Sequence, residues 1–448
     1  MKKIITYGTF DMLHYGHINL LKRAKELGDY LIVGVTSEEY DYNRGKLNVS
    51  QSLLTRIENV KKTGLADKII VEEYFGQKVS DIQQYEVDTF AIGSDWVGKF
   101  DYLKEYCNVV YLDRTKGVSS TDLRNEKNSI LNIGVVGSGR IAGRFIIESK
   151  YVSGVNVDCV FGRTEANIKN FCDKYELNGY YTDYNEFLSQ IDAVYIATPH
   201  DTHYKYAKEA LLNGKHVLCE KPMVLKGEQA EELFKIAKDR RLIIQEAIKT
   251  VYAPAFNRLV NVAKSGIIGN IRDINATFTK LVTDKTLREY NKDVGGSVTE
   301  LATYPLSVIV KLLGTNYKDI TFSSIYDDET GVDTYTKINL VYENAMATAN
   351  VGLGAKREGD LVIAGTKAYI YVPAPWWKTE YFEIRFEDPT KVQKFFVKFD
   401  GDGLRYELSD FLNAIYKSKC SYKFKNEESV CLAEIIDFYL NKIKKDKM

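Results

Sequence analysis

The sequence is poor in cysteine and proline, and it has no long apolar run. Its six cysteines are scattered among mostly apolar neighbours with no C-x-x-C pair, which argues against a zinc site and against a disulfide framework. No signal-peptide pattern follows Lys2 and Lys3, and no apolar run is long enough to span a membrane. We therefore expect reduced thiols, a cytoplasmic location, no membrane partner and no metal site built by the protein.

Neither sign of charge is in excess. The 448 residues include 61 Lys and Arg and 61 Asp and Glu, and no block of like charge is long enough to follow a nucleic-acid backbone. We therefore expect no nucleic-acid partner, and any nucleotide that binds should be small. The length exceeds that of one ordinary domain and predicts two or three.

Histidine is rare, yet two of the five histidines lie three residues apart near the N-terminus. Apolar residues at 4–7 predict a strand, and those at 20–27 recur at helical spacing, so His14 and His17 fall on a strand-to-helix turn. A helix N-terminus offers free N–H groups and the positive end of the helix dipole, which suit a phosphate, and Gly16 lets the backbone approach closely. The alternative is structural: His14 would cap the turn and His17 would pack.

The stretch that holds both histidines, residues 8–17 (GTFDMLHYGH), resembles the signature of the cytidylyltransferase branch of the HxGH nucleotidylyltransferases, close to the glycerol-3-phosphate cytidylyltransferase type. Residues 93–101 (GSDWVGKFD) and 114–121 (RTKGVSST) resemble two later motifs of that family, in the same order. The resemblance covers residues 1–126 and implies a small Rossmann-like α/β domain. It also implies that an alditol phosphate of the glycerol 3-phosphate kind attacks the α-phosphorus of CTP, with Mg²⁺ on the triphosphate and pyrophosphate leaving.

The first domain should contain a small parallel sheet. Strand-like runs at 30–35, 68–71, 89–92 and 109–112 alternate with helical patterns. The three motifs follow the first, fourth and fifth strands, and ligands gather at the carboxyl ends of parallel strands. The motifs should therefore converge on one site.

The residues assigned to this site come partly from the resemblance and partly from phosphate chemistry. His14 and His17 would stabilise charge, and a basic residue at Arg44 or Lys46 would meet the phosphates of both reactants; we favour Lys46 as catalytic, although both could be ordinary surface charges. Arg56 matches an arginine that the family keeps. The predicted CTP contacts are Thr9, Phe10, Asp11, Gly16, Arg56, Asp95, Trp96, Arg114, Thr115, Ser119, Ser120 and Thr121.

A second strand-turn-helix pattern follows a short polar joint at residues 123–129. Residues 133–142 (IGVVGSGRIA) combine a strand with G-x-G-x-x-A at the head of a helix, which is the dinucleotide-binding fingerprint. The next strand, 155–161, leads to Arg163, near the place where an acidic residue would accept the ribose hydroxyls of NAD. The arginine favours NADP(H), and NAD(H) stays possible because an arginine can also stack on the adenine.

Three further motifs, residues 198–203 (TPHDTH), 220–222 (EKP) and 245–247 (QEA), resemble those of the Gfo/Idh/MocA oxidoreductases. The resemblance covers the rest of the chain from residue 130. It implies an NAD(P)-binding Rossmann domain at 130–248 and an α+β domain with a large, mostly antiparallel sheet at 249–448, for substrate binding and oligomerisation. The whole chain is therefore predicted to be an α/β protein of three domains.

The resemblance also implies a catalytic pair. In that family the lysine of Glu-Lys-Pro, here Lys221, contacts cofactor and substrate, and Glu300, the predicted substrate-binding residue, stands where aspartate is usual, four residues before Tyr304. A tyrosine hydroxyl beside a lysine ammonium can donate a proton as hydride reaches a carbonyl carbon, although Tyr304 could simply pack like most of the 32 tyrosines. The predicted cofactor contacts are Gly137, Ser138, Gly139, Arg140, Ile141, Arg163, Thr198, Pro199, His203, Glu220 and Lys221.

The fusion of the two halves favours consecutive reactions. Our hypothesis is a bifunctional enzyme that reduces a keto-sugar phosphate to an alditol phosphate with NADPH and then converts it with CTP to a CDP-alditol, a donor for cell-surface polysaccharides. One alternative is a glycerol-3-phosphate cytidylyltransferase whose second unit only dimerises. Another is a sensor in which the second unit reports the NADPH/NADP ratio to the transferase. We expect a homo-oligomer.

Overall fold

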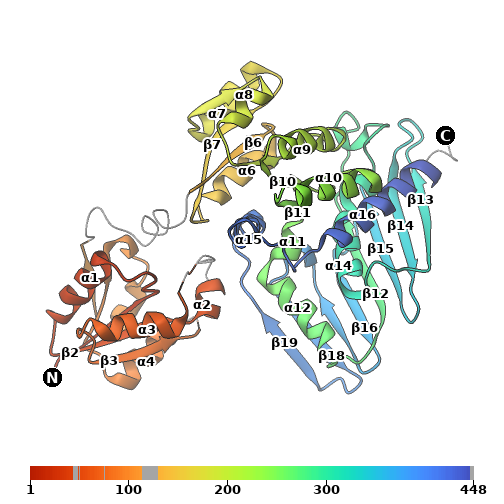
Figure 1. The fold of residues 1–448 in the computed structure, drawn as a ribbon. Helices are drawn as coiled ribbons and strands as arrows, with labels where there is room; N and C mark the ends of the chain where they lie inside the picture. The colour runs from red at the N-terminus through yellow and green to blue at the C-terminus, as the bar shows by residue number, and fades with distance from the viewer. Residues whose placement is uncertain (44–48, 50, 75, 114–129, 444–448) are drawn as a thin grey trace. The chain divides into compact units, whose positions relative to one another are not determined.

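The computed structural model shows two compact units, each with its own sheets and helices (Figure 1). The units are Met1–Ile130 with Val152–Gly154, and Leu131–Tyr151 with Val155–Met448. No helix in the described part of the chain is long and apolar enough to cross a membrane. The structure describes residues 1–43, 49, 51–74, 76–113 and 130–443.

The first unit is built on a five-stranded parallel sheet with the order β3-β2-β1-β4-β5, which confirms the predicted α/β class. Successive side chains of β1 point to opposite faces, so Ile4 packs with α1 and α3 on one face and Ile5 packs with α4 on the other. The bounds of the elements are β1 Lys3–Gly8, α1 Tyr15–Lys25, β2 Tyr30–Thr36, α2 Glu38–Asn43, α3 Leu53–Lys62, β3 Lys68–Glu72, α4 Gln77–Tyr85, β4 Thr89–Gly93, η1 Ser94–Trp96, η2 Asp101–Glu105 and β5 Asn108–Leu112.

The second unit begins with a six-stranded parallel sheet of order β11-β10-β9-β6-β7-β8. The strand order reverses between β6 and β9, which is where an open α/β sheet binds its ligand. The bounds are β6 Leu131–Val136, α6 Arg140–Ser149, β7 Val155–Phe161, α7 Glu165–Tyr175, β8 Gly179–Tyr181, α8 Tyr184–Ser189, β9 Ala193–Ile196, η3 His200–Thr202, α9 His203–Leu212, β10 His216–Glu220, α10 Gly227–Asp239 and β11 Ile244–Ala247.

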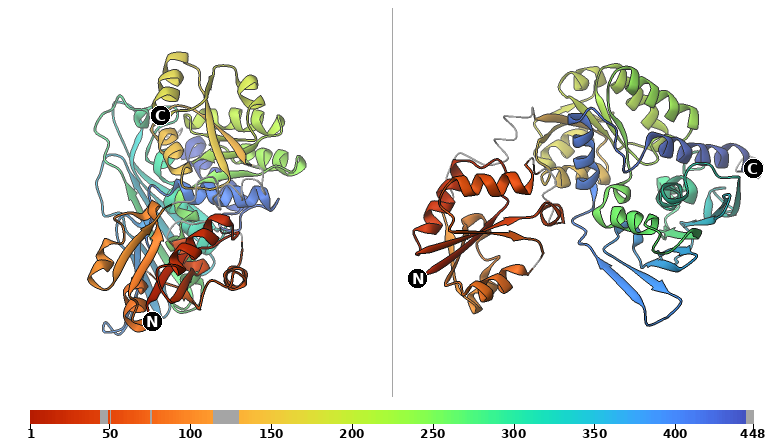
Figure 2. Two further views of the ribbon diagram at one scale, coloured as in Figure 1. Left: turned by 90° about the vertical axis from the view of Figure 1, so that its left-hand side faces the viewer. Right: turned by 60° about the horizontal axis from the view of Figure 1, so that its bottom comes forward.

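An eight-stranded sheet of order β13-β14-β15-β12-β16-β17-β18-β19 completes this unit, and its helices gather on one face (Figures 1 and 2). Every neighbouring pair is antiparallel except β12 with β15, so the sheet is mixed but mostly antiparallel, as predicted. The bounds are α11 Lys249–Tyr252, α12 Pro254–Lys264, β12 Ile271–Thr279, η4 Arg288–Tyr290, α13 Ser297–Leu301, α14 Thr303–Leu313, β13 Asp319–Tyr326, β14 Asp333–Val341, β15 Met346–Gly352, β16 Leu361–Gly365, β17 Ala368–Val372, η5 Trp376–Lys378, β18 Tyr381–Phe386, β19 Val392–Phe396, α15 Leu404–Tyr416, α16 Asn426–Phe438 and η6 Tyr439–Ile443.

Candidate active sites

The two histidines of the first motif lie side by side at the turn between β1 and α1. His14 is the N-cap of α1, and its Nδ1 accepts a hydrogen bond from the Gly16 N–H at 3.1 Å. Its ring stacks on that of His17, with centroids 3.8 Å apart and planes 26° apart, and His17 meets the buried Phe10 edge-on. His14 therefore caps the helix and also holds a second imidazole beside it, at the carboxyl end of the central strand.

The turn that carries the histidines is held in an uncommon backbone conformation. Phe10 and Met12 have φ angles of 52° and 49°, in the left-handed region that residues other than glycine rarely adopt. Gln51, in the loop before α3, holds this turn through two hydrogen bonds. Its backbone N–H donates to Asp11 Oδ1 at 3.0 Å, and its side-chain Oε1 accepts from the Met12 N–H at 2.9 Å. Strain of this kind persists only where surrounding contacts hold it, and here they hold the histidine turn.

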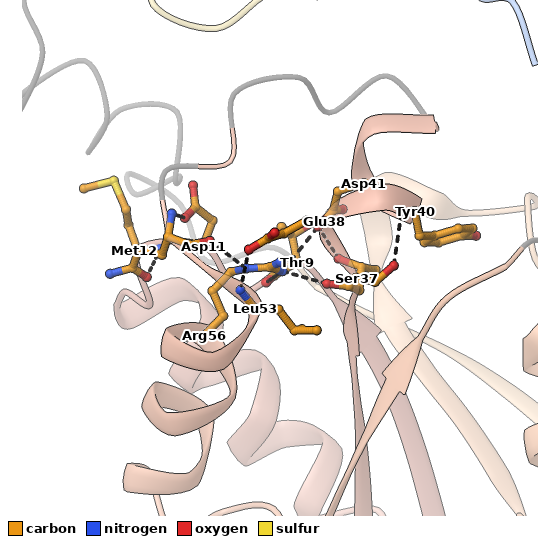
Figure 3. A network of polar contacts seen from close by, with 11 residues as sticks. Thr9, Asp11, Met12, Ser37, Glu38, Tyr40, Asp41, Leu53 and Arg56 are labelled. Atoms are coloured by element: carbon orange, nitrogen blue, oxygen red, sulfur yellow. Dashed lines mark hydrogen bonds and ion pairs between the residues drawn. The ribbon is translucent and has the colours of Figure 1, made fainter. Parts of the chain in front are cut away.

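Arg56 anchors a buried polar network beneath the same turn (Figure 3). Its side chain is fully buried, and Nη1 donates to the carbonyl oxygens of Thr9 and Thr36, each at 2.8 Å, and to Asp41 Oδ2 at 3.2 Å. The Asp41 carboxylate also accepts from the Thr9 hydroxyl at 3.0 Å and from the Thr36 hydroxyl at 2.5 Å. The network ties the first motif to β2, α2 and α3, and the contact of Arg56 with CTP stays a prediction.

A buried lysine that the sequence did not single out lies on the other face of β1. Lys78, in the first turn of α4, pairs with Glu72, the last residue of β3, and its ammonium lies 4.6 Å from the Tyr7 ring and 5.4 Å from the Phe100 ring. The Tyr7 hydroxyl donates to Asp81 Oδ2 at 2.8 Å, and burial raises the pKa of Tyr7 far above its ordinary value. A lysine within a helical pattern looks like a surface residue, so only the packing of α4 on the sheet identifies it.

Two further residues predicted for the first site lie within the described part of the chain. Asp95 and Trp96 lie in η1, directly after β4, and the Trp96 ring lies 5.8 Å from that of Phe100. The other predicted residues fall outside the described part of the chain. These are Arg44, Lys46, Arg114, Thr115, Ser119, Ser120 and Thr121.

The glycine fingerprint of the second unit lies between β6 and α6, at the point where the strand order reverses. Gly137 has a φ of 108°, and a Cβ there would lie 2.7 Å from the carbonyl oxygen of Ala197, so only glycine fits. A Cβ on Gly139, the residue that opens α6, would meet no atom within 4 Å among the described residues. This open space at a helix N-terminus fits a pyrophosphate, and the exposed Arg163 follows β7 on the adenosine side.

Lys221, the residue directly after β10, lies close to Glu300 of α13 and Tyr304 of α14. The Lys221 ammonium donates to the backbone carbonyl of Glu300 at 2.8 Å and lies 5.2 Å from the centroid of the Tyr304 ring. The Glu300 carboxylate pairs with Arg288 at 3.2 Å and faces His200 Nδ1 at 3.8 Å. Burial lowers the pKa of Lys221 and raises that of Tyr304 well above its ordinary value. Burial therefore favours the protonated form of the Tyr304 phenol.

His203 joins the two loops that flank this centre. Its ring is fully buried, with Nδ1 3.0 Å from the Pro222 carbonyl oxygen and Nε2 2.9 Å from that of Thr198. Burial lowers the pKa of His203, although both carbonyl contacts act in the opposite direction. The ring thereby holds the loop after β9 against the Glu-Lys-Pro turn, and a direct contact with the cofactor stays a prediction.

Glu246, in the third motif, supports the Lys221 turn from β11. It is buried, its Oε1 accepts from the Met223 N–H at 3.0 Å, and burial raises its pKa from 4.5 to about 7. Below pH 4.5 the carboxyl is protonated in both the folded and the unfolded state. Between pH 4.5 and about 7 it is protonated only in the folded state. Above about pH 7 the folded state must hold a buried charge. Burial of this carboxyl therefore costs stability progressively as the pH rises from 4.5 to 7.

We expect Glu246→Gln to stabilise the second unit by about 3 kcal/mol relative to the parent at pH 8 and by much less at pH 5, because the amide keeps an acceptor for Met223 and carries no charge. Calorimetric unfolding of the full chain at both pH values measures this difference. Glu387→Gln, at an exposed position, is the matched control and should change stability little at either pH. Equal effects of Glu246→Gln at the two pH values would contradict the assignment.

The geometry defines a nucleotidyltransferase followed by a dinucleotide-dependent oxidoreductase, and the family comparisons agree. Residues 5–126 match the cytidylyltransferase-like family, residues 131–248 the oxidoreductase family with an NAD-binding Rossmann fold, and residues 256–371 the GFO/IDH/MocA C-terminal domain. The chain therefore belongs to the cytidylyltransferase family in its first part and to the Gfo/Idh/MocA oxidoreductase family in its second. It is an enzyme that fuses the two domains.

Curated relatives match each half separately. Glycerol-3-phosphate cytidylyltransferase of Bacillus spizizenii is 50% identical over 130 residues, which is 29% of this chain and 100% of the relative. Trans-1,2-dihydrobenzene-1,2-diol dehydrogenase of Bos taurus is 27% identical over 318 residues, which is 68% of this chain and 95% of the relative.

Solved structures share the fold of the second half. KijD10, a 3-ketoreductase from Actinomadura kijaniata in complex with NADP and TDP-benzene, has a TM-score of 0.62 at 22% identity, over 69% of this chain and 96% of that one. UDP-N-acetylglucosamine 3-dehydrogenase GnnA from Acidithiobacillus ferrooxidans has a TM-score of 0.59 at 20% identity, over 68% of this chain and 95% of that one.

Proposed function

We propose that the chain makes a CDP-alditol in two steps: its second half reduces a keto-sugar phosphate with NADPH, and its first half transfers a cytidylyl group from CTP to the resulting alditol phosphate. The observation that carries the proposal is the stacked His14–His17 pair at the head of α1, in a half that matches a glycerol-3-phosphate cytidylyltransferase along its entire length. The fused reductase fold supplies a source for the alditol.

In the transferase reaction, a phosphate oxygen of the alditol phosphate forms a bond to the α-phosphorus of CTP. The bond from that phosphorus to the oxygen that bridges to the β-phosphate breaks, and pyrophosphate leaves. The reaction needs no general base, because the attacking oxygen is already ionised. The stacked imidazoles and the positive end of the α1 dipole stabilise charge that builds up on the phosphates. Arg56 and Asp41 hold the turn in place from below.

The sequence also predicts Mg²⁺ on the triphosphate, with phosphate oxygens and water as its main ligands. Within the described ranges, no group of three His, Cys, Asp or Glu side chains is arranged to hold a metal ion.

In the reductase half, Gly137, the open N-terminus of α6 and Arg163 suit a dinucleotide, and Arg163 favours NADPH through its 2′-phosphate. When bound, NADPH supplies the hydride that reduces the carbonyl carbon. The Tyr304 hydroxyl gives its proton to the carbonyl oxygen, and the neighbouring Lys221 ammonium stabilises the phenolate that remains. The Glu300 carbonyl keeps Lys221 directed at this position.

A paired substrate panel tests the proposal. A series of alditol phosphates is offered with CTP and pyrophosphate release is followed, and the corresponding ketose phosphates are then offered with NADPH. We expect the preferred alditol phosphate to be the reduction product of the preferred ketose phosphate. Unrelated preferences would refute consecutive action. NADPH binding without turnover of any ketose would support a non-catalytic second unit, and transferase activity that follows the NADPH/NADP ratio would support a sensor.

A further inference from the structure

Lys249 is a cation beside the reductase centre that has no hydrogen-bond or ion-pair partner among the described residues. It opens α11 two residues after β11, and β11 pairs in parallel with β10 so that Ala247 lies opposite Glu220. Lys249 therefore leaves the sheet next to the catalytic Lys221, at the same carboxyl edge. Its ammonium is partly buried, and it makes no hydrogen bond or ion pair with any residue that the structure describes.

The charges that face Lys249 do not neutralise it. Lys378 is engaged by Asp402, whose Oδ1 accepts from its ammonium at 3.1 Å, and Asp402 also lies 3.5 Å from Arg144. Glu220 accepts from the Tyr195 hydroxyl at 2.5 Å. Lys249 thus faces the positive charge of Lys378 and two carboxylates, Asp402 and Glu220, that already have other partners.

Glu407 of α15 is the remaining acid near Lys249. It is fully buried, and neither carboxylate oxygen has a hydrogen-bond partner in the part of the chain that the structure describes. Burial, together with the nearby Glu220, raises its pKa well above the ordinary value. Burial therefore favours the protonated, uncharged form of Glu407. Burial also lowers the pKa of Lys249, which is the cost of leaving an ammonium here without a counter-ion.

Lys249 lies on the substrate side of the sheet. The adenosine end of a dinucleotide is expected near Arg163 after β7, whereas β11 is the edge strand at the opposite end of the order β11-β10-β9-β6-β7-β8. The 2′-phosphate of the cofactor therefore does not account for Lys249.

A chain of side-chain contacts connects the segment around Lys249 to Tyr304. The Thr250 hydroxyl donates to the Trp377 carbonyl at 2.7 Å, which fixes α11 against the turn that bears Lys378. The Trp377 ring stacks on Phe278 with centroids 4.0 Å apart, and Phe278 meets Tyr304 edge-on at 5.0 Å. One continuous set of contacts therefore runs from the two lysines to the proposed proton donor.

We propose that Lys249, with Lys378 beside it, binds the phosphate monoester of the ketose and so selects phosphorylated substrates for reduction. This assignment rests on the proposed ketoreductase activity and adds the group that recognises the substrate. The phosphate supplies the negative charge that Lys249 lacks in the protein. It also holds the end of the ketose that is remote from Tyr304.

The test is made on the full chain with Lys249→Met, which keeps the length and packing of the side chain without its charge. NADPH oxidation is measured with the preferred ketose phosphate and with the same ketose lacking the phosphate. We expect KM for the phosphate ester to rise about 10- to 100-fold, with little change in kcat and no change in kcat/KM for the unphosphorylated ketose. Lys238→Met, at an exposed position of α10, is the matched control and should leave both substrates unaffected.

A second measurement does not require turnover. Inorganic phosphate should slow the chemical acylation of Lys249 in the parent enzyme, followed by mass spectrometry, and leave that of Lys238 unchanged. An equal loss with both ketoses in Lys249→Met, or no protection by phosphate, would overturn the assignment. A preference of the parent for nucleotide-diphosphate sugars over ketose phosphates would overturn the choice of a monoester. No turnover of any ketose, together with protection of Lys249, would refute the proposed reductase activity and support the phosphate site.

Discussion

Replacing His14 with asparagine is expected to lower cytidylyl transfer by about 10²- to 10⁴-fold while α1 and the first unit stay folded. Asparagine is a good N-cap, so its side-chain oxygen can still accept from the Gly16 N–H that His14 Nδ1 now satisfies. What disappears is the imidazole that stacks on His17. The substitution therefore separates the capping role of His14 from its proposed role at the phosphates.

His17→Asn should reduce the rate to a similar extent, although His17 has no capping role. Pyrophosphate release measures both variants, and the fused reductase is an internal control because NADPH oxidation by the same chains should not change. Near-normal pyrophosphate release in both variants would show that the pair is structural. Loss of both activities would point to misfolding, which circular dichroism and thermal unfolding detect.

Tyr304→Phe is expected to lower kcat for ketose reduction by about 10²- to 10⁴-fold, with a small effect on KM. Phenylalanine keeps the ring that Lys221 covers at 5.2 Å and that Phe278 meets edge-on, so only the proton donor is removed. Burial holds the pKa of Tyr304 well above its ordinary value, so the parent enzyme should retain the phenolic proton across the neutral range.

Lys221→Met should lower the same rate at least as far, because it removes the charge that stabilises the phenolate. Cytidylyl transfer by both variants should be unchanged. It serves as their internal control, just as NADPH oxidation does for the histidine variants. A rate of ketose reduction by Tyr304→Phe equal to that of the parent would refute the tyrosine as proton donor. His200, whose Nδ1 lies 3.8 Å from the Glu300 carboxylate, would then be the alternative donor.

The features that could be predicted from the sequence are those set by local spacing. The apolar run of β1 and the helical spacing in α1 predicted that the two histidines lie where the strand gives way to the helix. In the structure His14 is the N-cap of α1 and His17 lies in its first turn. The approach of Lys221 to Tyr304 follows from motif order, because both motifs come from one family whose fold brings them together.

What could not be predicted is burial, since it depends on which distant element packs against a residue. Arg56 and Lys78 are cations on helices with no local sign of burial, and each is enclosed by strands and loops far away in the sequence. Trp376 could have been exposed or buried; it is buried, and its Nε1 donates to the Thr277 carbonyl at 2.8 Å. Glu407 and Lys249 have no hydrogen-bond partner among the described residues, and only the folded structure reveals this.

The parallel pairing of β12 with β15 sets the order in which a nascent chain can fold. All five strands of the first sheet lie before residue 113, so that sheet can assemble while the ribosome is still translating the second half. Strand β12, by contrast, must wait for Met346–Gly352 to emerge before it gains its parallel neighbour. Until β15 and then β16 have been made, the two edges of β12 have no neighbour and can pair with wrong strands.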